Sequence, residues 1–294
     1  MNQYADAAGL VERSAAALVR GIPDKPADDG FFGPASVTWR ISGDISAPVA
    51  GLRALMIQAL HPLAMAGVDQ HSDWRADPVG RLAATSAYLA TITFGERASA
   101  ERVAAHVRRI HERVTGVDHE TGQPYAAGDP ALLLWVHVAL VESNIAARQI
   151  FGTPMSPADA DRYIEEMVVA AELVGVPAEF VPDNAAAVGS YLSRLRPQLL
   201  CSAAARESMA YLLDPPGLDD EVAEIWQDIR DATLISLPDW ARQMYGYTTA
   251  DLTPSRREEI RQALGVLDAV FLGEPGVLEA RQRIVLRMRS AVRA

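Results

Sequence analysis

The stretch from residue 131 to residue 151 is long, helix-patterned and very apolar. Asp129 and Pro130 come directly before it, and a proline at the first helical position is a common way for a helix to begin. Gly152 follows and ends the pattern. Because a helix this apolar is stable in water only when other elements surround it, the sequence predicts a central helix on which the rest of the chain packs.

The remaining chain reads as shorter helices separated by prolines and glycines. We count roughly a dozen helical patterns, with no alternating strands and no repeat of fixed period. The sequence therefore predicts an all-α protein with a single large helical domain over residues 1–294. Residues 247–294 are expected to form a C-terminal helical extension of that domain.

Three local features accompany this prediction. Residues 37–41 are the one strand-like stretch and are expected to form an extended linker. Residues 117–130 are rich in glycine and proline and are expected to form a loop. Pro62 lies inside the helical pattern of residues 51–65, so a kink is expected next to His61.

Composition and charge exclude several classes of function. The formal net charge of −11 argues against nucleic acid or an anionic membrane as a partner. Cys201 is the single cysteine, so neither a disulfide framework nor a cysteine-based metal site is expected. The sequence has no run of about 18 uninterrupted apolar residues, so no membrane span is expected. Residues 1–20 lack the layout of a secretion signal, which favours a cytoplasmic protein.

Three histidines, His61, His111 and His137, lie on apolar, helix-patterned sequence. On the helix of residues 103–114, Val103, Val107, Ile110 and Val114 form the expected core stripe, and His111 flanks it on the side of Ala100 and Ala104. His106 lies on the side of the arginines. Small neighbours leave room for a flat ligand beside the His111 imidazole. A hydrogen-bonded core histidine is the alternative interpretation.

Three further polar residues, Glu142, Arg81 and Thr85, have more than one interpretation. Glu142 lies in the most apolar helix and needs a partner, because an unpaired buried carboxylate is costly. It is expected to form an ion pair with Arg81 or Arg148, to orient a histidine, or to bind a metal. Arg81 and Thr85 share one helix face at i, i+4 spacing and suit a carboxylate or an oxygen ligand. Alternatively, Arg81 simply pairs with an acidic residue near the start of its helix.

Familiar enzyme motifs are missing, including the phosphate-binding glycine-rich loop, Gly-x-Ser-x-Gly, His-Glu-x-x-His and Glu-x-x-His. A different set of short segments stands in a fixed order and spacing: residues 39–44, 51–62, 71–73, 77–85, 94–95, 107–116, 125–126, 129–130, 134–137 and 237–246. In that order they resemble the DUF2236 family, which contains the MpaB proteins and the catalytic domain of rubber oxygenases (latex clearing proteins). The resemblance spans about residues 40–246.

The resemblance implies a globin-like helical core that holds b-type haem. It makes His111 the proximal iron ligand and hence the metal-binding residue, and places Arg81 and Thr85 in the haem pocket. Trp135, His137 and His61 are implied as further contacts at the site. Rubber oxygenases use the haem iron to activate dioxygen and cleave polyisoprene.

One departure from the family pattern bears on the substrate. Rubber oxygenases can carry a lysine just before the threonine, where this chain has Ala84. That difference and the missing secretion signal argue against polyisoprene.

We therefore expect a haem b-dependent oxygenase that acts with dioxygen on a small apolar organic substrate, and a homodimer is a further expectation. One alternative is a non-catalytic haem-binding carrier or sensor. The other is a non-haem iron enzyme that uses His61, His111, His137 and Glu142.

Overall fold

The computed structural model describes residues 9–218, 220–249 and 252–293, so residues 1–8 of the N-terminal segment lie outside the described part. The described chain is all-α apart from one short hairpin. In order, its elements are α1 (Leu10–Gly21), α2 (Val37–Ser42), α3 (Ala47–Ala59), α4 (Pro62–His71), α5 (Pro78–Phe94), α6 (Arg97–His111), β1 (Thr115–Val117), β2 (Pro124–Ala126), α7 (Pro130–Phe151), α8 (Pro157–Val174), the 3₁₀ turn η1 (Ala178–Phe180), α9 (Ala185–Leu195), η2 (Arg196–Gln198), α10 (Ala203–Leu213), α11 (Asp220–Ser236), α12 (Asp239–Tyr245), α13 (Pro254–Gly273) and α14 (Val277–Arg293).

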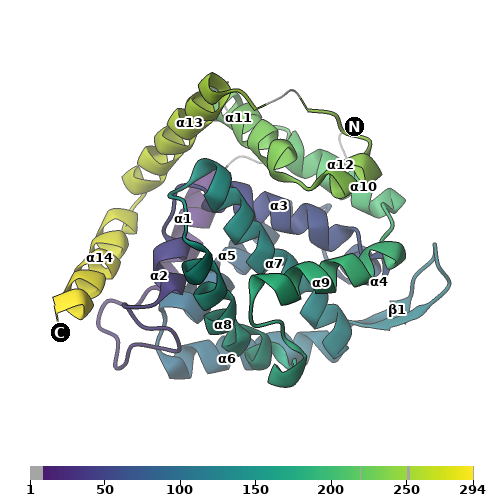
Figure 1. The fold of residues 1–294 in the computed structure, drawn as a ribbon, viewed down its shortest axis with the longest axis horizontal. Helices are drawn as coiled ribbons and strands as arrows, with labels where there is room; N and C mark the ends of the chain where they lie inside the picture. The colour runs from purple at the N-terminus through teal and green to yellow at the C-terminus, as the bar shows by residue number, and fades with distance from the viewer. Residues whose placement is uncertain (1–8, 219, 250–251, 294) are drawn as a thin grey trace.

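Helix α7 is central, as the sequence predicts. It packs against α3, α8, α9, α11 and α13, and Figure 1 shows it in the middle of the molecule. Its Trp135 is 0% exposed and donates Nε1–H to the carbonyl of Gln58 on α3 at 3.0 Å. The core is therefore built outward from α7.

By length and composition α7 is the one described helix that would be able to cross a membrane by itself. In its most apolar window, 56% of the residues are buried inside the structure, and the core helix of a soluble protein passes the same test. Helices α3 and α4 pass the test only as one bent pair. These findings are weak evidence for a span.

The kink expected at His61 is present. Helix α3 ends at Ala59, α4 begins at Pro62, and their axes differ by 103°. His61 has extended backbone angles (φ −85°, ψ 113°), as the residue before a proline commonly does. The bend turns α4 away from α3 and fixes His61 at the corner between them.

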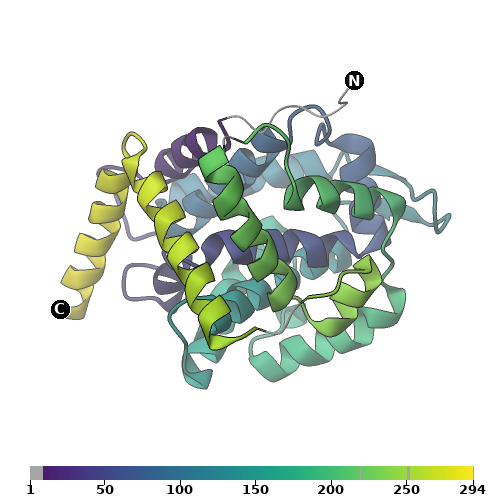
Figure 2. The ribbon, with the colours of Figure 1, turned by 90° about the horizontal axis from the view of Figure 1, so that it is seen from above.

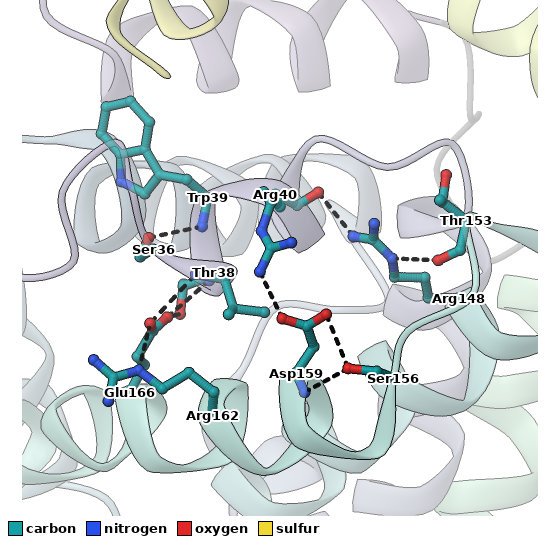
Figure 3. A network of polar contacts seen from close by, with 11 residues as sticks. Ser36, Thr38, Trp39, Arg40, Arg148, Thr153, Ser156, Asp159, Arg162 and Glu166 are labelled. Carbon is teal, nitrogen blue, oxygen red and sulfur yellow. Dashed lines mark hydrogen bonds and ion pairs between the residues drawn. The ribbon is translucent and has the colours of Figure 1, made fainter. Parts of the chain in front are cut away.

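Residues 37–41 form helix α2, so the prediction of an extended linker is wrong (Figure 3). The Ser36 hydroxyl accepts a hydrogen bond from the N–H of Trp39 at 3.1 Å. The carboxylate of Glu166 on α8 accepts from the N–H and the hydroxyl of Thr38 at 2.9 and 2.8 Å. A carboxylate stabilises the N-terminus of a helix, and this one comes from 128 residues away, where the local β-branched pattern gives no sign of it.

The same network joins α2 to α7 and α8. Arg40 pairs with Asp159 at 2.8 Å, and Arg148 donates to the carbonyls of Arg40 and Thr153 at 2.8 and 2.7 Å (Figure 3). Asp44 accepts from the N–H of Thr153 at 3.1 Å. The polar residues of segment 39–44 therefore connect α2 to α7 and α8.

Two other boundaries differ from the prediction. Residues 115–126 form a two-stranded antiparallel hairpin in which Gly116 lies opposite Tyr125, where the sequence predicts a helix end and then a loop. Helix α6 ends at His111, before Val114. Short strands held by contacts to another element carry little signal of their own.

The C-terminal helices α13 and α14 follow one another along one edge of the molecule (Figures 1 and 2). Arginines of α14 form ion pairs with acidic residues of α13 and of the loop after α1: Arg281 with Asp268, Arg283 with Asp24, and Arg287 with Asp29. This basic helix is thus engaged in contacts within the chain.

Candidate functional site

The site begins with the hairpin of helices α5 and α6, which only Gly95 and Glu96 connect. Ala100 and Ala104 of α6 are buried with Ile92 and Tyr88 of α5. His111 stands seven residues after Ala104, nearly two helical turns, and so continues the same stripe. It is half-buried, whereas His106 is exposed. The structure therefore places His111 on the side that the sequence predicts.

The His111 imidazole has no hydrogen-bond partner in the part of the chain that the structure describes. Its Nδ1 is fully enclosed and unpaired, and its side chain makes no hydrogen bond with any described residue. Burial lowers the pKa of His111, so the ring is neutral near pH 7. An unpaired buried nitrogen costs about 1–3 kcal/mol, and such a group in a native protein calls for an explanation. A neutral, unbonded imidazole is available to bind a ligand.

The apolar surface next to His111 is uncovered. Ile110, predicted as part of the core stripe, is 47% exposed, and Val107 is only half-buried. On α5, Ala84 and Thr85 are also exposed. The apolar side of α6 is buried at Ala100 and Ala104, where α6 packs on α5 and α8. Toward His111 no helix of the described chain covers this side completely.

The guanidinium of Arg81 is positively charged and partly buried, and no acidic side chain of the described residues pairs with it. Burial lowers the pKa of its guanidinium, and its described hydrogen bond goes to the hydroxyl of Ser72. The nearest helix-start acid, Asp77, caps α5 and pairs with Arg13 at 2.9 Å. No ion pair links Arg81 to any described residue, so pairing at the helix start is not its role. An uncompensated cation of this kind suits an anionic ligand.

Thr85 follows Arg81 by one turn. Its hydroxyl donates to the carbonyl of Arg81 at 3.1 Å, and the side chain is exposed. Thr85 therefore lies at the surface of α5, one turn from the more buried Arg81.

His61 and Trp135 lie together at the start of α7. His61 is 8% exposed, its Nδ1 has no partner, and its ring centroid is 5.9 Å from that of Trp135. Burial lowers the pKa of His61, and the carboxylate of Asp129 opposes this in part. Gly128 lies against the carbonyl of His111, and Asp129, the next residue, raises the pKa of His61 through its charge.

His137 lies elsewhere on α7. It is 9% exposed, and burial lowers its pKa to about 4. Two residues after Trp135, it is rotated about 200° around the helix, away from the face that meets His61. The ring contact of His61 is with Trp135, and its described contacts do not include His137.

Glu142 is engaged in an ion pair with Arg53 of α3. Its carboxylate accepts two hydrogen bonds from the Arg53 guanidinium, one of them at 2.8 Å. Arg53 is 1% exposed and also donates to Ser143 Oγ at 2.7 Å and to the Ser236 carbonyl at 2.9 Å. The prediction that Glu142 pairs with Arg81 or Arg148 is wrong. Helix α3, which carries Arg53, packs along this face of α7, and α5, which carries Arg81, does not.

The described residues contain no group of three or more His, Cys, Asp or Glu side chains placed to hold a metal ion. His61, His111, His137 and Glu142, the ligand set of the non-haem iron alternative, therefore do not form such a group in the described structure. Two surface pockets, of about 700 Å³ beside α8 and α9 and about 530 Å³ beside α14, are lined by none of these residues.

Sequence reasoning gave no site role to Arg53, Asp129 or Tyr125, although the last two lie in segments that carry the family resemblance. Arg53 had a usable signal, since an arginine inside an apolar helical pattern needs a buried acid, and Glu142 was one. Tyr125 and Asp129 gave no comparable signal, because the hairpin that carries the first was not predicted.

A sequence model of the family described as "ER-bound oxygenase mpaB/B'/Rubber oxygenase, catalytic domain" matches residues 39–269. No curated protein and no solved structure matches the chain. The matched segment runs from α2 into α13 and includes every candidate residue of the site. Because it covers well over half of the chain, the protein belongs to the mpaB/B′/rubber oxygenase catalytic-domain family and is an oxygenase of that family.

Proposed function

We propose that this protein is a haem b-dependent oxygenase that oxidises a small apolar organic molecule with dioxygen. Beyond family membership, one observation carries the proposal. The His111 imidazole is neutral, has no hydrogen bond within the described chain and stands beside an uncovered apolar surface. A neutral imidazole with a free ring nitrogen beside apolar surface is able to bind haem iron.

The side chains around His111 fit a b-type haem by their chemistry. His111 would bind the iron. The unpaired Arg81 guanidinium would pair with a propionate carboxylate, which supplies the missing negative charge. Ile110 and Val107 would cover the apolar macrocycle and lose their contact with water.

When bound, haem supplies the iron centre at which dioxygen is activated, while the protein supplies orientation and a dry surrounding. Thr85, one turn from Arg81, is the polar group that we assign to the reacting side. Ala84 stands where rubber oxygenases can carry a lysine, so this chain has no basic side chain at that position. His61, kept neutral by burial, would hold or release a proton at Nδ1, and Trp135 would fix its ring.

His137 is left outside this constellation, because it faces the other side of α7 from Trp135. A core histidine is the role that we now propose for it. The homodimer remains part of the proposal and is tested by light scattering of the purified protein.

The test of the function is dioxygen uptake by haemin-loaded protein supplied with small alkenes and other apolar compounds. The expected result is substrate-dependent uptake that Arg81→Met and His111→Ala abolish and that His106→Ala, on the exposed side of α6, preserves. Haemin binding without uptake for any compound would favour a carrier or sensor. Protein that takes up no haemin would contradict the proposal.

A further inference from the structure

The hairpin β1–β2 connects the last residue of α6 to the start of α7. The N–H of Val114 donates to the carbonyl of His111 at 3.2 Å, and the N–H of Ala127 donates to the carbonyl of Val114 at 2.8 Å. Gly128 then lies against the His111 carbonyl. The position of the hairpin therefore determines where the backbone of His111 lies.

Three side chains fasten this hairpin to α4: Gln70, His71 and Tyr125, which we call the α4 clamp. The hydroxyl of Tyr125 donates to Gln70 Oε1 at 2.9 Å, and Gln70 Nε2 donates to the carbonyl of Val117 at 3.0 Å. His71 Nε2 is 3.1 Å from the carbonyl of Thr115. Its ring meets the Tyr125 ring edge-on at 6.2 Å. The clamp thus holds both strands.

Gly116 shows how closely the hairpin approaches α4. A Cβ at this position would lie 2.7 Å from the Tyr125 hydroxyl and 3.0 Å from Gln70 Oε1. The backbone of Gly116 has no positive φ, so local conformation does not require glycine here. Glycine in a strand weakens it, and close approach of another element is a common reason for its presence. The clamp supplies that reason.

His111 needs such an anchor. It is the last residue of α6, where helices tend to fray, and its Nδ1 has no partner. Imidazoles that bind metals are usually oriented by a hydrogen bond from the second ring nitrogen. With that bond absent, the orientation of the ring has to come from the backbone on which it stands.

We propose that the α4 clamp is the positioning device for His111, with Gln70 and Tyr125 as its positioning residues. The inference rests on the proposed function, since it concerns a ligand for haem. The clamp acts through the hairpin and the end of α6, and it touches neither substrate nor cofactor.

The test compares Tyr125→Phe and Gln70→Ala with His119→Ala, an exposed position in the turn of the same hairpin. One readout is the NMR signal of the His111 ring in haem-free protein, assigned with His111→Ala. The other is haemin affinity together with the absorption spectrum of the bound state. Each clamp variant is expected to shift or broaden the His111 signal and to weaken haemin binding roughly two- to tenfold, as loss of one hydrogen bond implies.

Two further variants separate positioning from general stability. Gln70→Glu keeps an acceptor for the Tyr125 hydroxyl and is expected to restore part of the affinity that Gln70→Ala loses. Tyr125→Phe is expected to add little in a Gln70→Ala background, because the two residues act as one unit.

The proposal is overturned if both clamp variants match His119→Ala in the ring signal and in affinity. It is equally overturned if they lower only the melting temperature. If wild-type protein takes up no haemin, the proposed function fails, and the His111 ring signal alone decides whether the clamp positions that residue.

Discussion

Two polar groups in the interior of this protein differ sharply in how they are satisfied. Arg53 and Glu142, at the contact of α3 and α7, form an ion pair with additional hydrogen bonds to Ser143 and Ser236. His111, at the end of α6, has no partner within the described chain. The hydrogen-bonded ion pair holds two helices together. The unpaired imidazole lowers the free energy of unfolding, and binding of a ligand to its nitrogen would offset that loss.

The largest expected effect is on the free energy of unfolding, when the ion pair of Arg53 and Glu142 is broken. Glu142→Ala leaves the Arg53 guanidinium buried without a counter-charge and is expected to lower the free energy of unfolding by about 3–5 kcal/mol. Denaturant unfolding measures this. Glu165→Ala, which removes a partner from an exposed pair with Arg162, is the control, with a change below about 1 kcal/mol. A loss below that value for Glu142→Ala would show that Arg53 does not depend on this carboxylate.

The next effect concerns Arg81, the cation without an acid. Arg81→Met is expected to weaken haemin binding roughly ten- to a hundredfold, because a charge-assisted hydrogen bond contributes about 1.5–3 kcal/mol. The free energy of unfolding of the haem-free protein should not fall, since no ion pair is lost. Arg109→Met, an exposed arginine of α6, serves as the control. Unchanged affinity in Arg81→Met would remove Arg81 from the site.

The free energy of unfolding is expected to depend on pH through His137, which is buried and neutral, and the change is similar in size to the effect of Arg81→Met on haemin binding. Its pKa is lowered from 6.5 to about 4, so the unfolded chain binds the proton more readily between these values. The stabilisation is complete above pH 6.5 and is lost progressively as the pH falls toward 4. At pH 5 the loss should be about 2 kcal/mol relative to pH 7.

The measurement is the free energy of unfolding at both pH values. His137→Leu should remove most of the difference, whereas the exposed His106→Leu should leave it unchanged. An equal pH dependence in wild type and His137→Leu would mean that His137 is accessible to protons in the folded protein.

The smallest effect sharpens the contrast with Glu142. His111→Leu replaces an unpaired imidazole by an apolar side chain and is expected to raise the free energy of unfolding of haem-free protein by about 1 kcal/mol. Thermal or denaturant unfolding without haemin measures this. A fall of more than about 1 kcal/mol would indicate that the ring has a structural partner and belongs with the satisfied groups.

The helical architecture was predictable because its signals are local. The apolar stretch of α7 and the interruption by Pro62 each appear within a few turns of sequence. Helix α2 and the hairpin were not predictable, because Glu166 and the α4 clamp stabilise them from distant parts of the chain. Pattern alone gives the wrong secondary structure where a distant side chain supplies the cap.

The candidate site was predictable in part. The periodicity of α6 indicated the side on which His111 lies, but not that the helix ends there or that Ile110 is uncovered. Which histidines share a neighbourhood depends on helix packing, and the ring contact of His61 is with Trp135 and not with His137. The partner of Glu142 depended on which helix lies beside α7, which spacing along the chain does not reveal.

The most direct test of His111 as an iron ligand is a haemin titration of purified wild type, His111→Ala and His106→Ala, followed by Soret absorption with and without dithionite and CO. The expected result is saturable uptake at one haem per chain in wild type and His106→Ala, and none in His111→Ala. Wild-type protein without a Soret band, or His111→Ala with the wild-type spectrum, would contradict it.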